Sequence, residues 1–230
     1  MRGYINQSEI RMFAISAIIL TPVAVLCYQQ ELSLGTISSI PLLFILLAML
    51  MTCNMEIPIT KIRTKRNKTL DRDALVLEEI YSVPLIKEIS IGTSRVFDTV
   101  ITFNVGGFLI PLSILLYLII TQLNFAALEI MLIIIVAVTM LSEIVDGIGI
   151  VIPSYIGIMA IPFTLIFDPH SAALVTFVAG TGGIMIGTLT TLLTIDKEKK
   201  GSAYISIGGV GNFRAIYITT MIAVLISYFA

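Results

Sequence analysis

The sequence has few of the residues with which soluble proteins face water. It contains no tryptophan, one histidine and two cysteines, and only 13% of its residues are charged. A soluble domain usually carries about a quarter charged residues. Hydrophobic residues make up 57% of the chain, and the mean hydropathy is +1.01. These values indicate a polytopic α-helical membrane protein and argue against a soluble domain.

The same shortages exclude several functions. A net charge of −1, with no long basic face, gives no reason to expect a nucleic-acid partner. His170 lies in a polar turn and is expected to be solvated, whereas Cys27 and Cys53 lie inside apolar runs and are expected to be buried. No group of histidine, cysteine and carboxylate has the spacing of a metal site. We therefore expect no metal, no cofactor and no enzymatic activity.

Long apolar runs dominate the chain. Seven of them approach the length needed to cross the hydrocarbon core of a bilayer. They cover residues 12–30, 37–55, 99–121, 125–141, 147–167, 172–195 and 203–229. They predict an all-α fold, a transmembrane helical bundle of about seven spans that forms a single membrane domain over residues 1–230. Glycines and prolines inside the runs predict broken helices.

Basic residues predict the orientation. They cluster at residues 61–72 and 197–200, whereas the connections at Glu31, Gln122 and Asp168 contain no lysine or arginine. The positive-inside rule then predicts a multi-pass protein of the inner cell membrane, with its N-terminus in the cytoplasm and its C-terminus outside. Residues 57–98 would form a charged cytoplasmic insertion between the second and third spans. Partial alternation in its second half, residues 74–92, predicts a small hairpin or lid.

Four apolar runs contain patches of glycine. The patches comprise Asn104, Gly106, Gly107 and Pro111; Gly147, Gly149 and Pro153; Gly180, Gly182, Gly183 and Gly187; and Gly208, Gly209, Gly211 and Asn212. Small residues let helices pack closely in membranes. Broken helices can also expose backbone groups that line a binding site at the bilayer midplane, as in many transporters. The sequence leaves both interpretations open.

Arg214 directly follows the last glycine patch. It lies about eleven residues into its run, where a guanidinium is costly unless it faces the protein interior and finds a partner. The candidate partners are Glu143, Asp146, Asp98 and Glu56. Either a structural ion pair or an anion-binding site would satisfy the arginine. The candidate ligand-binding residues are therefore Arg214, Asn104, Gly106, Gly107, Gly208, Gly209, Asn212, Asp146 and Glu143.

A degenerate intramembrane aspartyl protease is a remote alternative. Asp98 and Asp146 would share a proton in such an enzyme. However, Gly147 and Gly149 follow Asp146, whereas those proteases place their Gly-x-Gly directly before the aspartate. The order of residues argues against this activity.

Several stretches resemble a known family. They are residues 55–59, 100–113, 147–153, 179–181 and 205–213, in which Asn-x-Gly-Gly-x-x-x-Pro and Ser-Ile-Gly-Gly-x-Gly are the most specific motifs. Together they resemble the domain-of-unknown-function 1614 family of archaeal and bacterial integral membrane proteins, from about residue 45 to the C-terminus. The resemblance implies a multi-spanning membrane protein and no established activity. Relatives carry aspartates where this chain has Leu189, or its neighbours, and Arg214, which argues against a proton relay.

The leading functional hypothesis is a membrane protein that binds or transports a small anionic solute or a phospholipid at a glycine-lined site. Arg214 would supply the positive charge, and Thr188, Thr190 and Thr191 would add hydroxyl groups. The alternative is a structural or accessory subunit, which would act as a homo-oligomer or beside another membrane protein. In both hypotheses the lipid bilayer is the surrounding partner.

Overall fold

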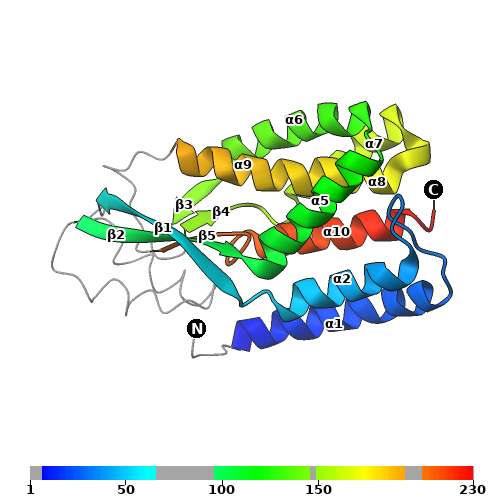
Figure 1. Ribbon diagram of the computed structural model, residues 1–230, viewed down its shortest axis with the longest axis horizontal. Helices are drawn as coiled ribbons and strands as arrows, with labels where there is room; N and C mark the ends of the chain where they lie inside the picture. Colours follow the sequence, from blue (N-terminus) through cyan, green and yellow to red (C-terminus); the bar gives the residue numbers. More distant parts are fainter. Residues whose placement is uncertain (1–6, 66–95, 146–148, 195–203, 230) are drawn as a thin grey trace.

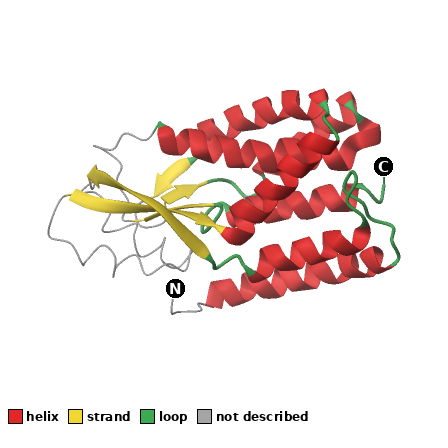
Figure 2. Cartoon of the chain, viewed as in Figure 1, coloured by secondary structure: helices red, strands yellow, loops and turns green. Residues whose placement is uncertain are grey.

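The computed structural model describes residues 7–65, 96–145, 149–194 and 204–229 (Figure 1). Helices form the larger part of the molecule, and strands gather at one end of it (Figure 2). Several sequence predictions fall outside the described residues. They concern the lid at residues 74–92, Asp146, Gly147 and the basic cluster at 197–200.

The described residues contain seven helical segments, one in each apolar run. They are α1 (Gln7–Tyr28); α2 (Ser39–Met51); η1 (Val105–Leu109) with α5 (Ile110–Thr121); α6 (Phe125–Leu141); η2 (Ile156–Met159) with α7 (Ala160–Phe167); η3 (Pro169–Ser171) with α8 (Ala172–Thr176), η4 (Phe177–Thr181) and α9 (Gly182–Leu193); and α10 (Phe213–Ile226). Segments η1 and η4 are π-helical, so the helices are irregular at two of the glycine patches. Each predicted apolar run thus contains a helix, although not every helix spans its whole run.

The prediction of an all-α fold is wrong at the start of three runs, which begin with strands. These strands are β2 (Val96–Asn104), β4 (Gly149–Val151) and β5 (Tyr204–Ile207), and they pair with β1 (Glu56–Lys65) and β3 (Glu143–Val145). Val100, Ile101 and Thr102 are β-branched and therefore suit a pleated strand. A continuous apolar run does not distinguish a buried strand from a helix, so the periodicity concealed these strands.

The strands form a three-stranded sheet in the order β1-β2-β5 and a separate β3–β4 hairpin. Strands β1 and β2 are antiparallel, with Glu56 opposite Asn104. Strands β2 and β5 are parallel, with Thr102 opposite Ser206 and Phe103 opposite Ile207. A parallel pair needs a long crossover connection. Here the whole stretch from η1 to α9 provides it. In chain order, most of the helices therefore lie between β2 and β5, two strands that are neighbours in the sheet.

Close helix packing depends on the small residues of α9. Helix α9 lies along α6, where a side chain at Gly183 or Gly187 would collide with Ile134 or Val138 of α6. Helices α1 and α2 pack together on the other side of the molecule, and α10 lies between the two groups (Figure 1). The glycines of this run therefore serve helix packing, which was one of the two interpretations of the sequence.

One helix in the described residues, Pro169–Leu193, is long and apolar enough to cross a membrane, and 89% of its most apolar window is buried inside the molecule. The other apolar helices are shorter, and in three of the runs a strand occupies the part that precedes the helix. The observation is weak support for membrane association, and the number of spans stays a prediction.

Candidate functional site

Two of the predicted glycine patches meet in the structure. Gly107 lies in η1, directly after β2, and Gly208 lies in the turn after β5. The φ angle of Gly208 is 76°, which glycine adopts without strain. A Cβ atom on Gly208 would lie 2.5 Å from the carbonyl carbon of Gly107 and 2.8 Å from Cβ of Phe108. The two backbones are therefore in direct contact, and this contact supports the packing interpretation of both patches.

The asparagines of the same motifs bind backbone groups. Asn104 is fully buried and caps η1, because its Oδ1 accepts a hydrogen bond from Gly107 N at 2.8 Å, while its Nδ2 donates to Cys53 O. Asn212 is also fully buried, and the amide orientation that satisfies its neighbours places its nitrogen as the donor to Ile150 O at 2.7 Å. Each asparagine thus fastens a turn to a neighbouring segment.

Arg214 is exposed, so the expectation that it faces the interior is wrong. Strand β5 and the following turn take up the beginning of the seventh apolar run, so Arg214 lies in the first turn of α10 and not deep within a helix. Glu143 is exposed on β3, and none of the acids within the described ranges lies within ion-pair distance of Arg214. The roles of Arg214, Glu143 and Asp146 in ligand binding stay predictions.

A polar cluster lies on the sheet beside Gly209. The Thr102 hydroxyl donates to Glu56 Oε2 at 3.0 Å and lies 2.9 Å from the Tyr204 hydroxyl. Ser206 is fully buried, and its Oγ has no hydrogen-bond partner in the described part of the chain. From the sequence, Glu56 was expected only as a partner of Arg214. The cluster was missed because its residues come from three strands that the sequence did not predict.

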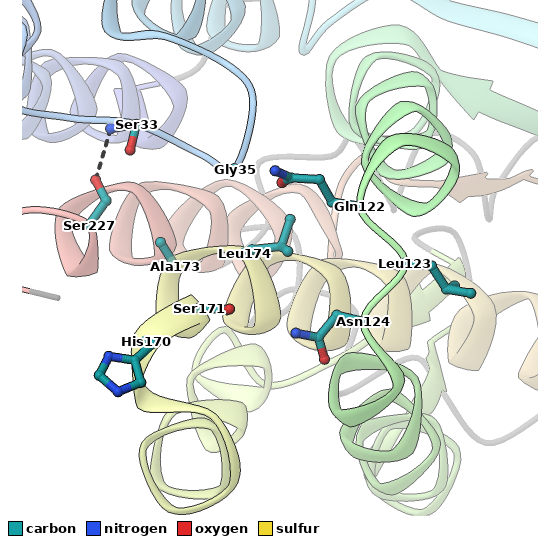
Figure 3. Close-up of a pocket in the computed structure, with 10 residues that line it drawn as sticks. All are labelled: Ser33, Gly35, Gln122, Leu123, Asn124, His170, Ser171, Ala173, Leu174 and Ser227. Carbon is teal, nitrogen blue, oxygen red and sulfur yellow. Dashed lines mark hydrogen bonds between the residues drawn. The ribbon is translucent and has the colours of Figure 1, made fainter.

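A cavity of about 470 Å³ lies at the end of the molecule opposite the sheet (Figure 3). We name it the loop-end pocket, because it forms where the α1–α2 and α5–α6 connections meet η3, the start of α8 and the end of α10. Its polar lining residues are Ser33, Gln122, Asn124, His170, Ser171 and Ser227. The volume falls within the range of about 300–1,000 Å³ that is typical of small-molecule sites.

Hydrogen bonds between loops build the pocket. Asn124 caps α6 by accepting from Ala127 N at 3.1 Å, and its Nδ2 donates to Asp168 Oδ2 at 2.7 Å. Asp168 Oδ1 in turn accepts from Ser171 N at 3.2 Å. The hydrogen bond from Asn124 is the main cause that holds the pKa of Asp168 below its usual value, and hydrogen bonds from Ser171 add to it. The α5–α6 and α7–η3 connections are therefore tied together.

The other polar groups of the lining form hydrogen bonds and carry no fixed charge. Ser33 N donates to Ser227 Oγ at 3.0 Å, which joins the α1–α2 connection to the end of α10 (Figure 3). Gln122 Oε1 is buried against Gly35 and has no hydrogen-bond partner among the described residues. Among the described residues, neither a lysine nor an arginine lines the pocket. Such a surface suits an uncharged ligand that both donates and accepts hydrogen bonds.

A family model described as "Protein of unknown function (DUF1614)" matches residues 50–226. The chain belongs to this family. The matched residues include both glycine patches that meet at Gly107 and Gly208, and they confirm the resemblance found in the sequence. They also include four polar residues of the loop-end pocket, namely Gln122, Asn124, His170 and Ser171. The chain matches no curated protein and no solved structure.

Proposed function

We propose that this DUF1614 protein is a multi-spanning membrane protein that binds a small polar molecule, or the polar part of a lipid, in the loop-end pocket. The observation that carries the proposal is the distribution of large apolar side chains over the outer faces of the helices. The exposed side chains include Ile18, Phe44, Ile120, Leu132, Met140, Ile166 and Leu193. Monomeric soluble proteins rarely expose large apolar patches. Lipid chains would cover these faces.

The interior of the bundle supports the same proposal. Thr164, Thr176 and Thr219 are fully buried in helices. Thr164 and Thr219 donate their hydroxyl hydrogens to carbonyls one turn earlier in their own helices, at 2.9 and 2.6 Å. Polar groups inside and apolar groups outside are the arrangement that membrane bundles use.

Charge supports the orientation. Lys61 is exposed on β1, at the sheet end of the molecule, and the basic cluster that follows it in the sequence continues from the same strand. The described lining of the loop-end pocket contains no lysine or arginine. By the positive-inside rule the sheet end would face the cytoplasm and the pocket would open outside.

An accessory subunit that assembles through its glycine faces finds less support. Gly106, Gly107, Gly183 and Gly187 are close to atoms of the same chain. These small residues are therefore occupied within the protein, and a homo-oligomer or a membrane-protein partner would need another surface.

Labelling of single cysteines tests the topology. Cys27 and Cys53 are both buried and would be replaced by alanine. A cysteine is then introduced by Leu123→Cys at the pocket end or by Lys61→Cys at the sheet end. In intact cells, a membrane-impermeant maleimide should label only the Leu123→Cys protein, and in inverted vesicles only the Lys61→Cys protein. Labelling of both in intact cells, or recovery of the protein in the soluble fraction, would overturn the proposal.

Native mass spectrometry tests binding in the pocket. The protein is extracted gently from its own membranes, and Ser171→Trp fills the pocket while Leu132→Trp alters only an exposed face of α6. A defined small adduct should accompany the unmodified protein and the Leu132→Trp control, and it should be lost from Ser171→Trp. An adduct that persists in folded Ser171→Trp would place the ligand elsewhere and reject the pocket.

A further inference from the structure

A second cavity of about 380 Å³ adjoins the loop-end pocket. It lies between α7, the start of η3 and the end of α10, and we name it the apolar groove. Its lining residues are Ile161, Leu165, Pro169, His170, Ile226 and Phe229. All of them except His170 are apolar, whereas six of the residues that line the loop-end pocket are polar.

His170 lines both cavities. It is the middle residue of the short helix η3, between Pro169, which lines the apolar groove, and Ser171, which lines the loop-end pocket. The polar and apolar cavities therefore meet at one turn of the chain. A single molecule that occupies both would have a polar part and an apolar part joined near His170.

From the shared residue His170 and the different linings on its two sides, we infer that the ligand is an amphiphile with an uncharged, hydroxyl-rich head group, such as a glycosyl-diacylglycerol. The inference rests on the proposed function and names its ligand class. The head group would occupy the loop-end pocket, and the beginning of the acyl chain would lie in the apolar groove.

The surroundings of the groove fit an acyl chain. Leu165 and Phe229 are exposed in the groove lining, and Ile166 and Phe167 extend the apolar surface along α7. In a bilayer this edge would open toward the lipid. Tyr228, next to Phe229, is also exposed, and tyrosine is enriched where membranes meet water.

The residues that line the loop-end pocket favour an uncharged head group over a phosphate. A phosphate binds best to cationic donors, but neither lysine nor arginine is among the described residues that line the pocket, and the nearby Asp168 carboxylate carries negative charge. Asp168 is already bonded to Asn124 and to Ser171 N. The hydroxyl and amide groups of the lining residues instead match sugar or glycerol hydroxyls, which donate and accept hydrogen bonds.

The test compares three probes at one concentration by native mass spectrometry of the delipidated full chain. They are monoglucosyl-dioleoylglycerol, dioleoyl-phosphatidylglycerol and free glucose. We expect the glucolipid to be retained at least tenfold more than either of the others. Equal retention of phosphatidylglycerol would overturn the uncharged head group. Equal retention of glucose would overturn the role of the groove while leaving the proposed polar pocket intact. Retention of none of the three would overturn the inference, and the endogenous adduct described above decides the pocket separately.

Matched tryptophan variants locate the lipid. Leu165 is 54% exposed in the groove, and Leu132 is 62% exposed on α6, outside both cavities, so both positions tolerate a larger side chain. Leu165→Trp should lower retention of the glucolipid at least tenfold, whereas Leu132→Trp should leave it unchanged. Thermal unfolding verifies that both variants fold. If folded Leu165→Trp retains the glucolipid as well as Leu132→Trp does, the groove does not hold the acyl chain and the inference fails.

Discussion

The backbone of Gly107 packs directly against the backbone of Gly208. The sheet explains this contact, because Phe103 and Ile207 are paired on the parallel strands β2 and β5. The chain leaves both strands at the same edge, so the segments that follow them lie side by side. The glycine after each strand allows the two backbones to approach.

The first prediction concerns this contact. Gly208→Ala should lower the free energy of unfolding by about 2–4 kcal/mol, because the new methyl group would strain a backbone at positive φ and collide with Gly107. Thermal unfolding in detergent measures the change. Ser154→Ala, at an exposed position, is the control. A Gly208→Ala protein as stable as this control would show that the two segments separate easily.

The second prediction concerns Asn104. Asn104→Ala should cost about 2–3 kcal/mol of folding free energy, because it removes the cap of η1 and leaves Cys53 O without its amide donor. Thr139→Ala provides a matched comparison, since the Thr139 hydroxyl bonds only to Val136 O of its own helix. Unfolding of the two variants is compared under the same conditions. Equal stability would mean that the buried amide contributes little.

The third prediction is that Arg214, unlike Gly208 and Asn104, contributes little to stability. Because the side chain is exposed, Arg214→Gln should change the free energy of unfolding by no more than about 0.5 kcal/mol. Removal of a positive charge from a helix N-terminus also relieves an unfavourable interaction with the helix dipole. Thermal unfolding and native mass spectrometry would be recorded together. Loss of the bound adduct in a stable Arg214→Gln protein would restore the original hypothesis that this arginine binds the ligand.

Much of the helical part of the fold was predictable from the sequence. Residues 125–141 were expected to form one helix, and α6 spans Phe125–Leu141. The strands were not predictable from the same signal, because Tyr204–Ile207 continues into the apolar residues of α10 after only a short glycine turn. The pairing with a strand far away in the sequence, β2, decides the conformation there, and a local pattern does not contain it.

The site was predictable only in part. The glycine motifs correctly indicated that Gly107 and Gly208 lie where backbone approaches closely. They did not reveal β5, and because this strand precedes α10, Arg214 lies at the beginning of a helix. The loop-end pocket combines residues from connections that are distant in the sequence, such as Ser33, Asn124 and Ser171. The sequence predicted that these connections lie on the same side of the membrane, and this was the one signal that could have indicated a shared site.

The last prediction is a pH dependence that arises at Asp168. The hydrogen bond from Asn124, followed by those from Ser171, holds the pKa of Asp168 below its usual value. A lowered folded-state pKa adds stability that is fully present above the unfolded-state pKa, about 3.9, and is lost as the pH falls through the folded-state pKa. The melting temperature should therefore drop more between pH 6 and pH 3 in the unmodified protein than in Asp168→Asn, whose side chain does not titrate. Other carboxylates affect both proteins equally, so an identical drop in the two would show that Asp168 does not stabilise the loops through its charge.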